Sequence, residues 1–219
     1  MKIAILGGTG KEGKGLAYRW LRSGHEVIIG SRGLEKAQAA ADDLRALSGK
    51  HPMVSGSTNL DAAAAADLVV LTVPYQAHQA MLEEVKPALQ GKILIDVTVP
   101  LVPPKVTRVQ LPAAGSAALE ARQILGEGVE LISAFQNISY EHLLDDEDEV
   151  NCDVLVTGGS KEARAVALGL VSDAGLKGWD AGPLENSVVA EGLTSILIHL
   201  NKQFGANSAG IQITGIPRD

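Results

Sequence analysis

The chain has 219 residues, which is enough for one large and one small domain but not for three. Hydrophobic residues make up 46% of the chain and aromatic residues only 3%, so its core must be built from Ala, Val, Ile and Leu, as in a parallel α/β sheet. The net charge of −7 and the lack of a Lys/Arg-rich run argue against nucleic-acid binding and against an anionic membrane surface.

The single cysteine, Cys152, excludes an intrachain disulfide and zinc sites with paired cysteines. No apolar run approaches the ~18 residues of a membrane span, and no targeting segment is recognisable. We therefore expect a cytoplasmic protein. The five consecutive acids at 145–149 are expected to form a solvated loop and not a metal site, because nothing near them fixes ligand geometry.

The first residues predict a strand, a glycine turn and a helix in that order. The apolar run at 3–6 ends at glycine, and the following residues recur at helical spacing. Gly8 permits a tight turn, Gly10 lets the backbone approach a diphosphate, and Gly13 lets the helix pack on the strand. We therefore predict dinucleotide binding at the helix N-terminus, against the alternative of a plain strand-to-helix turn.

The end of the second strand, predicted at 26–30, indicates which dinucleotide is bound. NAD sites place an acid there, whereas NADP sites place groups that receive the 2′-phosphate. This chain has Ser31 and Arg32 there, with Lys36 one helical turn further on. Hydroxyl, guanidinium and ammonium groups all bind phosphate, so the sequence favours NADP over the alternative of ordinary surface charges.

Strands and helices continue to alternate along the rest of the chain. Helices are expected at 34–47, 61–66, 116–125, 161–174 and 187–204, with one more that Gly91 closes, and strands at 53–56, 67–74, 92–97, 129–134, 153–157 and 210–216. This order predicts a Rossmann-type, doubly wound parallel sheet in an NADP-binding domain at 1–134. A smaller α/β domain at 135–219 would complete the substrate cleft.

Three further features lie close to predicted strand ends. Residues 72–76 and 98–100 follow neighbouring strands and should line the cofactor. His78 is expected to be a partly exposed helix residue, with a general acid or base role as the alternative. Lys105 and Arg108 lie in a proline-rich loop, where they are expected to be solvated charges; the alternative is contact with an anionic substrate.

Four groups of residues resemble one family, the NADPH-dependent reductases of coenzyme F420, an 8-hydroxy-5-deazaflavin. The likeness spans nearly the whole chain. It rests on Gly-Gly-Thr-Gly at 7–10 with Gly-Lys-Gly at 13–15, Gly-Ser-Arg at 30–32 with Lys36, Ser-Ala at 133–134, and Asp-Ala-Gly-Pro-Leu at 180–184 with Asn-Ser at 186–187. The resemblance implies hydride transfer between NADP(H) and F420 as co-substrate, with the deazaflavin held between the two domains.

The resemblance also implies roles for individual residues. The diphosphate and 2′-phosphate would be held by Thr9, Gly10, Lys11, Glu12, Ser31, Arg32 and Lys36. The ribose and nicotinamide would lie along Val73, Pro74 and Val99, and the deazaflavin would meet Gln136, Ile138, Thr194 and Ala209. No side-chain acid or base is required, because the deazaflavin carries the negative charge itself. Gln136 and Thr194 are assigned positioning roles; the alternative is that they are ordinary polar residues lining a domain junction.

Three positions depart from the family pattern. Well-known archaeal members have a histidine in place of Gln136, an arginine in place of Val188 and a serine in place of Gly192. These changes weaken the polar contacts that the family makes with the deazaflavin. Since F420 has an anionic tail, the missing arginine must be compensated elsewhere, or the substrate differs.

Two other functions are compatible with the sequence. The chain is either a reductase of another small substrate, such as an imine or hydroxy acid, or a non-catalytic NADP(H) sensor. Short-chain dehydrogenases are disfavoured, because none of the three tyrosines is followed by lysine four residues later. We also expect a homodimer, since the apolar helix at 188–200 offers a partner surface unless it is part of the core.

Overall fold

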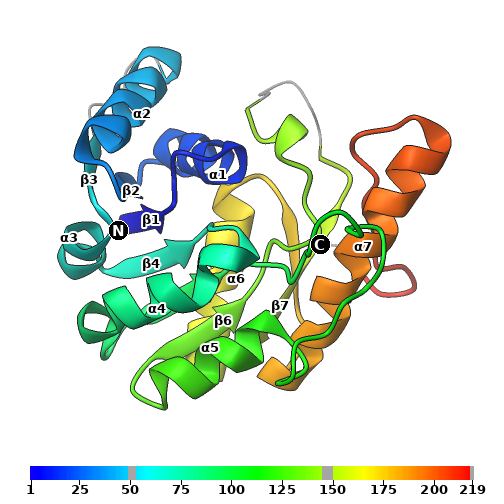
Figure 1. Ribbon diagram of the computed structural model, residues 1–219. Coiled ribbons are helices and arrows are strands. Elements are labelled where there is room, and N and C mark those ends of the chain that lie inside the picture. Colours follow the sequence, from blue (N-terminus) through cyan, green and yellow to red (C-terminus); the bar gives the residue numbers. More distant parts are fainter. Residues whose placement is uncertain (49–52, 145–149, 218–219) are drawn as a thin grey trace.

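The computed structural model describes residues 1–48, 53–144 and 150–217 (Figure 1). In this part of the chain eight strands form one sheet, in the order β3-β2-β1-β4-β5-β6-β7-β8. The strands are β1 (Lys2–Leu6), β2 (Glu26–Ser31), β3 (Val54–Thr58), β4 (Leu68–Leu71), β5 (Ile93–Asp96), β6 (Glu130–Ser133), β7 (Asp153–Gly158) and β8 (Lys177–Asp180). Neighbouring strands are parallel except β6 and β7.

Helices cover both faces of the sheet. They are α1 (Lys11–Arg22), α2 (Leu34–Leu47), α3 (Asn59–Ala65), α4 (Tyr75–Leu89), α5 (Ala117–Leu125), α6 (Lys161–Asp173) and α7 (Ser187–Phe204). Ile3 and Ile5 of β1 pack with α1, α2 and α6, while the alternate residues Ala4 and Leu6 pack in a second core with α3, α4 and α5. The predicted doubly wound α/β fold is thereby confirmed.

The register of the central strands brings their carboxyl ends to one level. Leu6, the last residue of β1, pairs with Gly30 of β2 and with Leu71 of β4, and Leu71 pairs with Asp96 of β5. The strand order reverses beside β1, since β2 and β3 lie on one side and β4 and β5 on the other. Ligands of such sheets bind in the crevice outside the strand ends at this reversal.

The last third of the chain joins the same sheet and the same core. The indole N–H of Trp20 in α1 donates to the carbonyl of Leu170 in α6 at 2.8 Å. The rings of Trp20 and Phe135 pack in a T-shaped arrangement, with their centroids 5.9 Å apart. Helix α7 packs against α5 and β7. The division into domains at residue 134 stays a prediction; it falls between β6 and β7, the antiparallel pair.

One expected element is wrong: residues 210–216 form no strand. The backbone of Asp153 donates to the carbonyl of Ile211 at 2.8 Å, but the next amide on this side, that of Ile213, donates to the Asp153 carboxylate at 2.7 Å. A side chain thus replaces the second ladder bond. The acidic run at 145–149 lies outside the described residues, and none of the described helices is long and apolar enough to cross a membrane.

Candidate functional site

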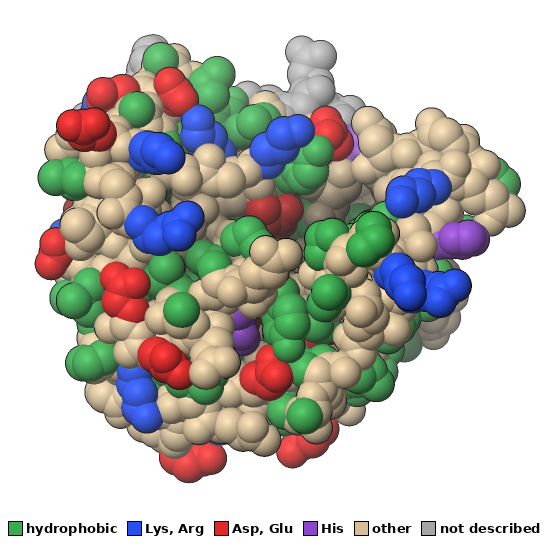
Figure 2. All heavy atoms as spheres, viewed as in Figure 1, with side chains coloured by type: hydrophobic (Ala, Val, Ile, Leu, Met, Phe, Trp, Pro, Cys, Tyr) green, Lys and Arg blue, Asp and Glu red, His purple; other side chains and the backbone are tan. Residues whose placement is uncertain are grey.

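A cleft of about 1160 Å³ runs along the carboxyl ends of the central strands and reaches α7. Its lining includes residues that directly follow β1, β4 and β5, together with Thr194, Leu197 and Asn201 of α7. Figure 2 shows this hollow from its open side, with Lys and Arg side chains grouped over α1 and α2 and again over α7 and the segment that crosses it. The cleft is long enough to bring together residues from both predicted domains.

The glycine turn forms one end of the cleft and has no room for a side chain at Gly8 or Gly13. The Gly8 amide donates to the carbonyls of Ile5 and Gly30 at 3.2 and 3.1 Å. A Cβ on Gly8 would lie 2.7 Å from the Ile5 oxygen, and one on Gly13 would lie 2.7 Å from the Gly8 Cα. Helix α1 therefore packs directly on the turn, as predicted from the spacing of these glycines.

Three helices that begin at the cleft lack a side-chain cap. The residues preceding α1, α2 and α4, namely Gly10, Gly33 and Pro74, line the cleft and provide no side-chain cap. Helices α3, α5 and α6 are capped by Thr58, Ser116 and Ser160. The first N–H groups of α1 and α2 thus face the cleft without a side-chain acceptor, which is the arrangement that binds phosphate.

Positive charge lies beside these helix starts. Arg32 and Lys36 line the cleft with exposed side chains, and neither forms an ion pair with a described residue. Ser31 is buried, and its hydroxyl accepts from the Gly33 amide at 3.4 Å. In the described part of the chain, therefore, the end of β2 presents a hydroxyl, a guanidinium and an ammonium group that can receive a phosphate.

The first turn of α1 holds two further charged groups at the cleft. The Lys11 ammonium donates to the Tyr140 hydroxyl at 3.1 Å and lies 4.5 Å from the centre of its ring, and the hydrogen bond raises the pKa of Lys11. Glu12 has one buried carboxylate oxygen without a hydrogen-bond partner among the described residues. Burial raises the pKa of Glu12 to about 8, so its carboxyl is largely neutral at pH 7.

Gln136 lies in the other half of the cleft, with its side chain fixed. Its side-chain amide nitrogen donates to the main-chain carbonyl of Asp96 and to the Ser133 hydroxyl, both at 2.8 Å. The main-chain carbonyl of Gln136 accepts from the Thr194 hydroxyl at 2.7 Å. Because the main-chain carbonyl of Asp96 can only accept a hydrogen bond, the side-chain amide of Gln136 cannot be flipped to exchange its oxygen and nitrogen. Its Oε1 atom is therefore an acceptor, and it is buried without a partner in the described structure.

Two neighbouring polar groups are also unpaired. The Thr98 hydroxyl and the Asn137 amide oxygen are buried, have no partner among the described residues, and belong to residues that line the cleft. A buried polar atom without a hydrogen bond costs about 1–3 kcal/mol. Three residues that line one cavity thus each have a polar atom without a partner in the described structure, and a ligand with several hydrogen-bonding groups would suit them.

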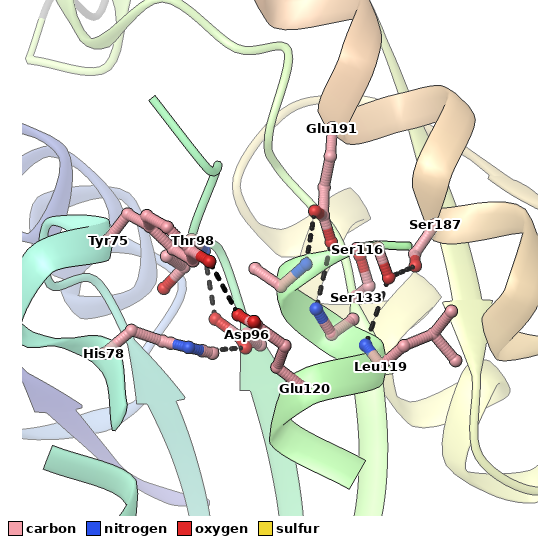
Figure 3. Close-up of polar contacts among 12 residues, drawn as sticks. Tyr75, His78, Asp96, Thr98, Ser116, Leu119, Glu120, Ser133, Ser187 and Glu191 are labelled. Atoms are coloured by element: carbon pink, nitrogen blue, oxygen red, sulfur yellow. Dashed lines mark hydrogen bonds and ion pairs between the residues drawn. The ribbon is translucent and has the colours of Figure 1, made fainter. Parts of the chain in front are cut away.

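A network of buried polar groups, formed by His78, Asp96 and Thr98, lies next to this half of the cleft (Figure 3). The His78 ring nitrogen lies 2.6 Å from one Asp96 oxygen, and the Thr98 amide donates to the other at 3.0 Å. The expectation that His78 is partly exposed is wrong, since it is 1% exposed and lies on the inner face of α4. Burial lowers the pKa of His78, but the Asp96 carboxylate outweighs this and leaves it raised.

Helix α7 is tied to α5 by a second set of buried contacts. The Glu191 carboxylate accepts from the amides of Ala117 and Ala118 at 2.7 and 3.1 Å, and the hydroxyls of Ser116 and Ser187 lie 2.7 Å apart (Figure 3). Burial raises the pKa of Glu191 to about 8, although the two amides oppose this. The contacts fix where α7 presents Thr194 to the cleft.

Comparison with known proteins agrees with this geometry. Residues 2–100 match the family model described as NADP oxidoreductase, coenzyme F420-dependent. A protein named F420-dependent NADP reductase from Methanothermobacter thermautotrophicus is 43% identical, with 99% of this chain and 96% of the relative covered. This chain belongs to the family of coenzyme F420-dependent NADP oxidoreductases. The family predicted from the sequence is thereby confirmed.

Other members and neighbours of the F420-dependent family extend the comparison. The F420-dependent NADP reductase of Methanocaldococcus jannaschii is 39% identical over 99% of both chains. A crystal structure of a putative F420-dependent NADP reductase from Arthrobacter sp. FB24 superposes with a TM-score of 0.83 at 26% identity, covering 98% of this chain and all of the other. An imine reductase from Myxococcus stipitatus, at 21% identity and a TM-score of 0.64, shares the fold; this chain covers 62% of its length.

The structure brings most of the predicted site residues of this F420-dependent oxidoreductase together. Gly8 and Gly13 form the turn beneath the cleft. The cleft is lined by Thr9, Gly10, Lys11, Glu12, Ser31, Arg32, Lys36, Val73, Pro74, Val99, Gln136, Ile138, Thr194 and Ala209. Val188 and Gly192 do not line it, and Gly192 faces the side chain of Val109.

Several residues of the site were not expected from the sequence. Tyr140 and Asn137 line the cleft, and Asn59 accepts from the Gly7 amide at 3.2 Å and so supports the glycine turn from α3. Their residue types are common in loops, and no spacing distinguishes them. No group of three His, Cys, Asp or Glu suited to a metal ion occurs among the residues that the structure describes.

Proposed function

We propose that this chain transfers a hydride between NADP(H) and coenzyme F420, with the two bound end to end in one cleft. One observation carries the proposal: a single cavity joins uncapped helix starts and the cations Arg32 and Lys36 to the unpaired acceptor of Gln136. The first half suits a phosphorylated dinucleotide. The second suits a flat ring with several polar groups.

In the nucleotide half, the backbone does most of the binding. The first N–H groups of α1 would hold the diphosphate, and the helix dipole favours its negative charge. Ser31, Arg32 and Lys36 would hold the 2′-phosphate that distinguishes NADP from NAD. Val73, Pro74 and Val99 would lie along the ribose and nicotinamide, where their side chains exclude water.

In the deazaflavin half, the side chains orient the ring. NADPH carries the hydride on nicotinamide C4, and F420 accepts it at C5 of its ring. Gln136 and Thr194 would fix the ring by hydrogen bonds, with Ile138 and Ala209 as apolar contacts. Such a transfer needs the two carbons about 3–3.5 Å apart and shielded from water. His78 and Asp96 do not line the cleft, so we assign them the role of holding the residues that do line it in position.

Mixing the purified protein with NADPH and oxidised F420 tests this function. Loss of the oxidised chromophore at a rate proportional to enzyme concentration is the expected result. A sensor would bind NADPH without turnover, and a reductase of another substrate would consume NADPH only with that compound. Either outcome, with F420 unchanged, would refute the proposal.

We also infer a homodimer in the cytoplasm. Val189 and Ile196 are 65% and 50% exposed, and with Leu193 and Leu200 they form an apolar stripe at helical spacing on α7. This stripe is not part of the core, so we infer that a second copy of the chain packs against it. Light scattering should give twice the mass of one chain, and Ile196→Glu should give monomers. The single, buried Cys152 fits a reducing compartment.

A further inference from the structure

Two segments without acidic residues meet at the end of the cleft that is remote from the glycine turn. Residues 97–119 contain Lys105 and Arg108 and no Asp or Glu, and residues 192–218 likewise contain no acid. The net charge of −7 therefore arises entirely from other parts of the chain. We propose that Lys105, Arg108 and Lys202, here called the cationic rim, bind the anionic tail of F420. This inference rests on the proposed function.

The loop that carries two of these cations is held in place by its backbone. Ser195 of α7 donates to the Arg108 carbonyl at 3.3 Å, and Gln110 donates to the carbonyls of Val102 and Lys105 at 3.2 and 3.4 Å. These bonds use main-chain oxygens, so the side chains of Lys105 and Arg108 are left for a ligand. Both are exposed.

The same loop reaches the cleft. Pro103 and Val106 line the cavity, and Lys105 stands between them in the chain. Arg108 follows two residues after Val106, at the point where the loop lies on α7. A ligand that leaves the cleft beside Val106 therefore passes both cations.

Lys202 lies on the side of α7 that joins the loop to the cleft. It is four residues after Ile198, which lines the cavity, and seven after Ser195, which binds the loop. Residues at these spacings share one side of a helix. The side with Lys202 is also distinct from the apolar stripe of Val189 and Ile196, so a dimer formed through that stripe leaves Lys202 accessible.

The charge of the rim is not neutralised within the described structure. Lys105, Arg108 and Lys202 form no ion pair with any described residue. Figure 2 shows Lys and Arg side chains grouped over α7 and its crossing segment, without red side chains between them. An acid-free rim attracts a phosphodiester or carboxylate chain without repelling it, and the attraction weakens as salt rises.

Equilibrium binding separates the rim from the ring-binding half of the cleft. The ligands are F420 and the same 5-deazaflavin nucleoside without the tail. For the variant with Lys105→Ala, Arg108→Ala and Lys202→Ala together, we expect the Kd of F420 to rise about 10-fold at low salt. The Kd values of the tailless nucleoside and of NADPH should change less than 2-fold.

Three controls make the result specific. Lys161→Ala removes an exposed lysine on α6 and should leave every Kd unchanged. Lys105→Arg with Lys202→Arg keeps the charge and should keep the affinity for F420. Raising the salt concentration should weaken F420 binding to the wild type but not to the triple alanine variant.

The outcomes that overturn the inference are distinct from failure of the proposed function. If the triple alanine variant leaves the Kd of F420 unchanged, or raises the Kd of F420 and of the tailless nucleoside equally, the cationic rim does not bind the tail. Equal affinity of the wild type for the two ligands would show the same. Absence of turnover would refute the proposed reaction, but the binding measurements would still decide the tail site.

Discussion

Replacement of Arg32 by alanine should reduce the preference of this enzyme for NADPH over NADH. Arg32 follows β2, lines the cleft and makes no ion pair with a described residue, so its side chain has no structural partner to lose. A charge-assisted hydrogen bond contributes about 1.5–3 kcal/mol, and exposure places Arg32 towards the low end of this range. The expected loss is 10- to 100-fold in the NADPH/NADH ratio of kcat/KM, or about 1.4–2.8 kcal/mol.

Initial rates with saturating F420 and varied NADPH or NADH give this ratio directly. The loss should appear as a higher KM for NADPH, while the parameters for NADH stay near their wild-type values, because only NADPH carries the 2′-phosphate. Arg45→Ala is the matched control. Arg45 lies in the last turn of α2, the helix that follows Arg32 in the chain. It pairs there with Asp42 and the Val54 carbonyl, so its loss should affect stability but not selectivity. A ratio within 2-fold of wild type, or equal weakening of both nucleotides, would refute the assignment.

Three other changes test separate parts of the site. Gln136→Trp fills the deazaflavin half and should raise the KM for F420 by at least about 10-fold while the Kd for NADPH stays near wild type; equal losses would place Gln136 elsewhere. Gly13→Ala puts a Cβ 2.7 Å from the Gly8 Cα, so it should lower the free energy of thermal unfolding by about 1–3 kcal/mol and weaken the binding of NADPH. The control is Gly169→Ala in α6, where the new Cβ meets open space and the change should be neutral or stabilising. Glu12 has a folded pKa of about 8 against 4.5 in model compounds, so stability falls as pH rises from about 4.5 to 8. In urea unfolding of the unliganded protein, the free energy of unfolding of Glu12→Gln should therefore exceed that of the wild type by about 1–3 kcal/mol at pH 9 and by little at pH 5. An equal difference at both pH values would exclude titration of Glu12 as the cause.

The parts of the site that depend on local sequence could be predicted. The strand, turn and helix of residues 2–22 follow from an apolar run and three spaced glycines, and each constraint acts within a few residues. The position of Ser31 and Arg32 follows equally from the end of β2. Because parallel strands align their carboxyl ends, these local elements also predict the edge of the sheet at which the cleft forms.

The parts that depend on pairing across the fold could not be predicted. The burial of His78 is one example, because its partner Asp96 lies on a strand whose register the sequence does not show. Similarly, Glu191 caps α5 from more than seventy residues away. The alternation of Ile211 and Ile213 is typical of a strand, but the Asp153 side chain takes the amide that a ladder would need.

These long-range bonds also support the proposed reaction, for which we expect no catalytic acid to be needed. The His78 ring binds the Asp96 side chain, and the main-chain carbonyl of Asp96 accepts from the side-chain amide of Gln136. The main-chain carbonyl of Gln136 accepts in turn from the Thr194 hydroxyl on α7. A continuous chain of hydrogen bonds thus runs from α4 to α7 beneath the deazaflavin half. Hydride transfer between two carbon atoms depends on their alignment, and a rigid floor supplies alignment before the substrates bind. We therefore propose that the buried His78 and Asp96 act by holding other residues in position. Their replacement should impair F420 binding without altering the pH dependence of turnover.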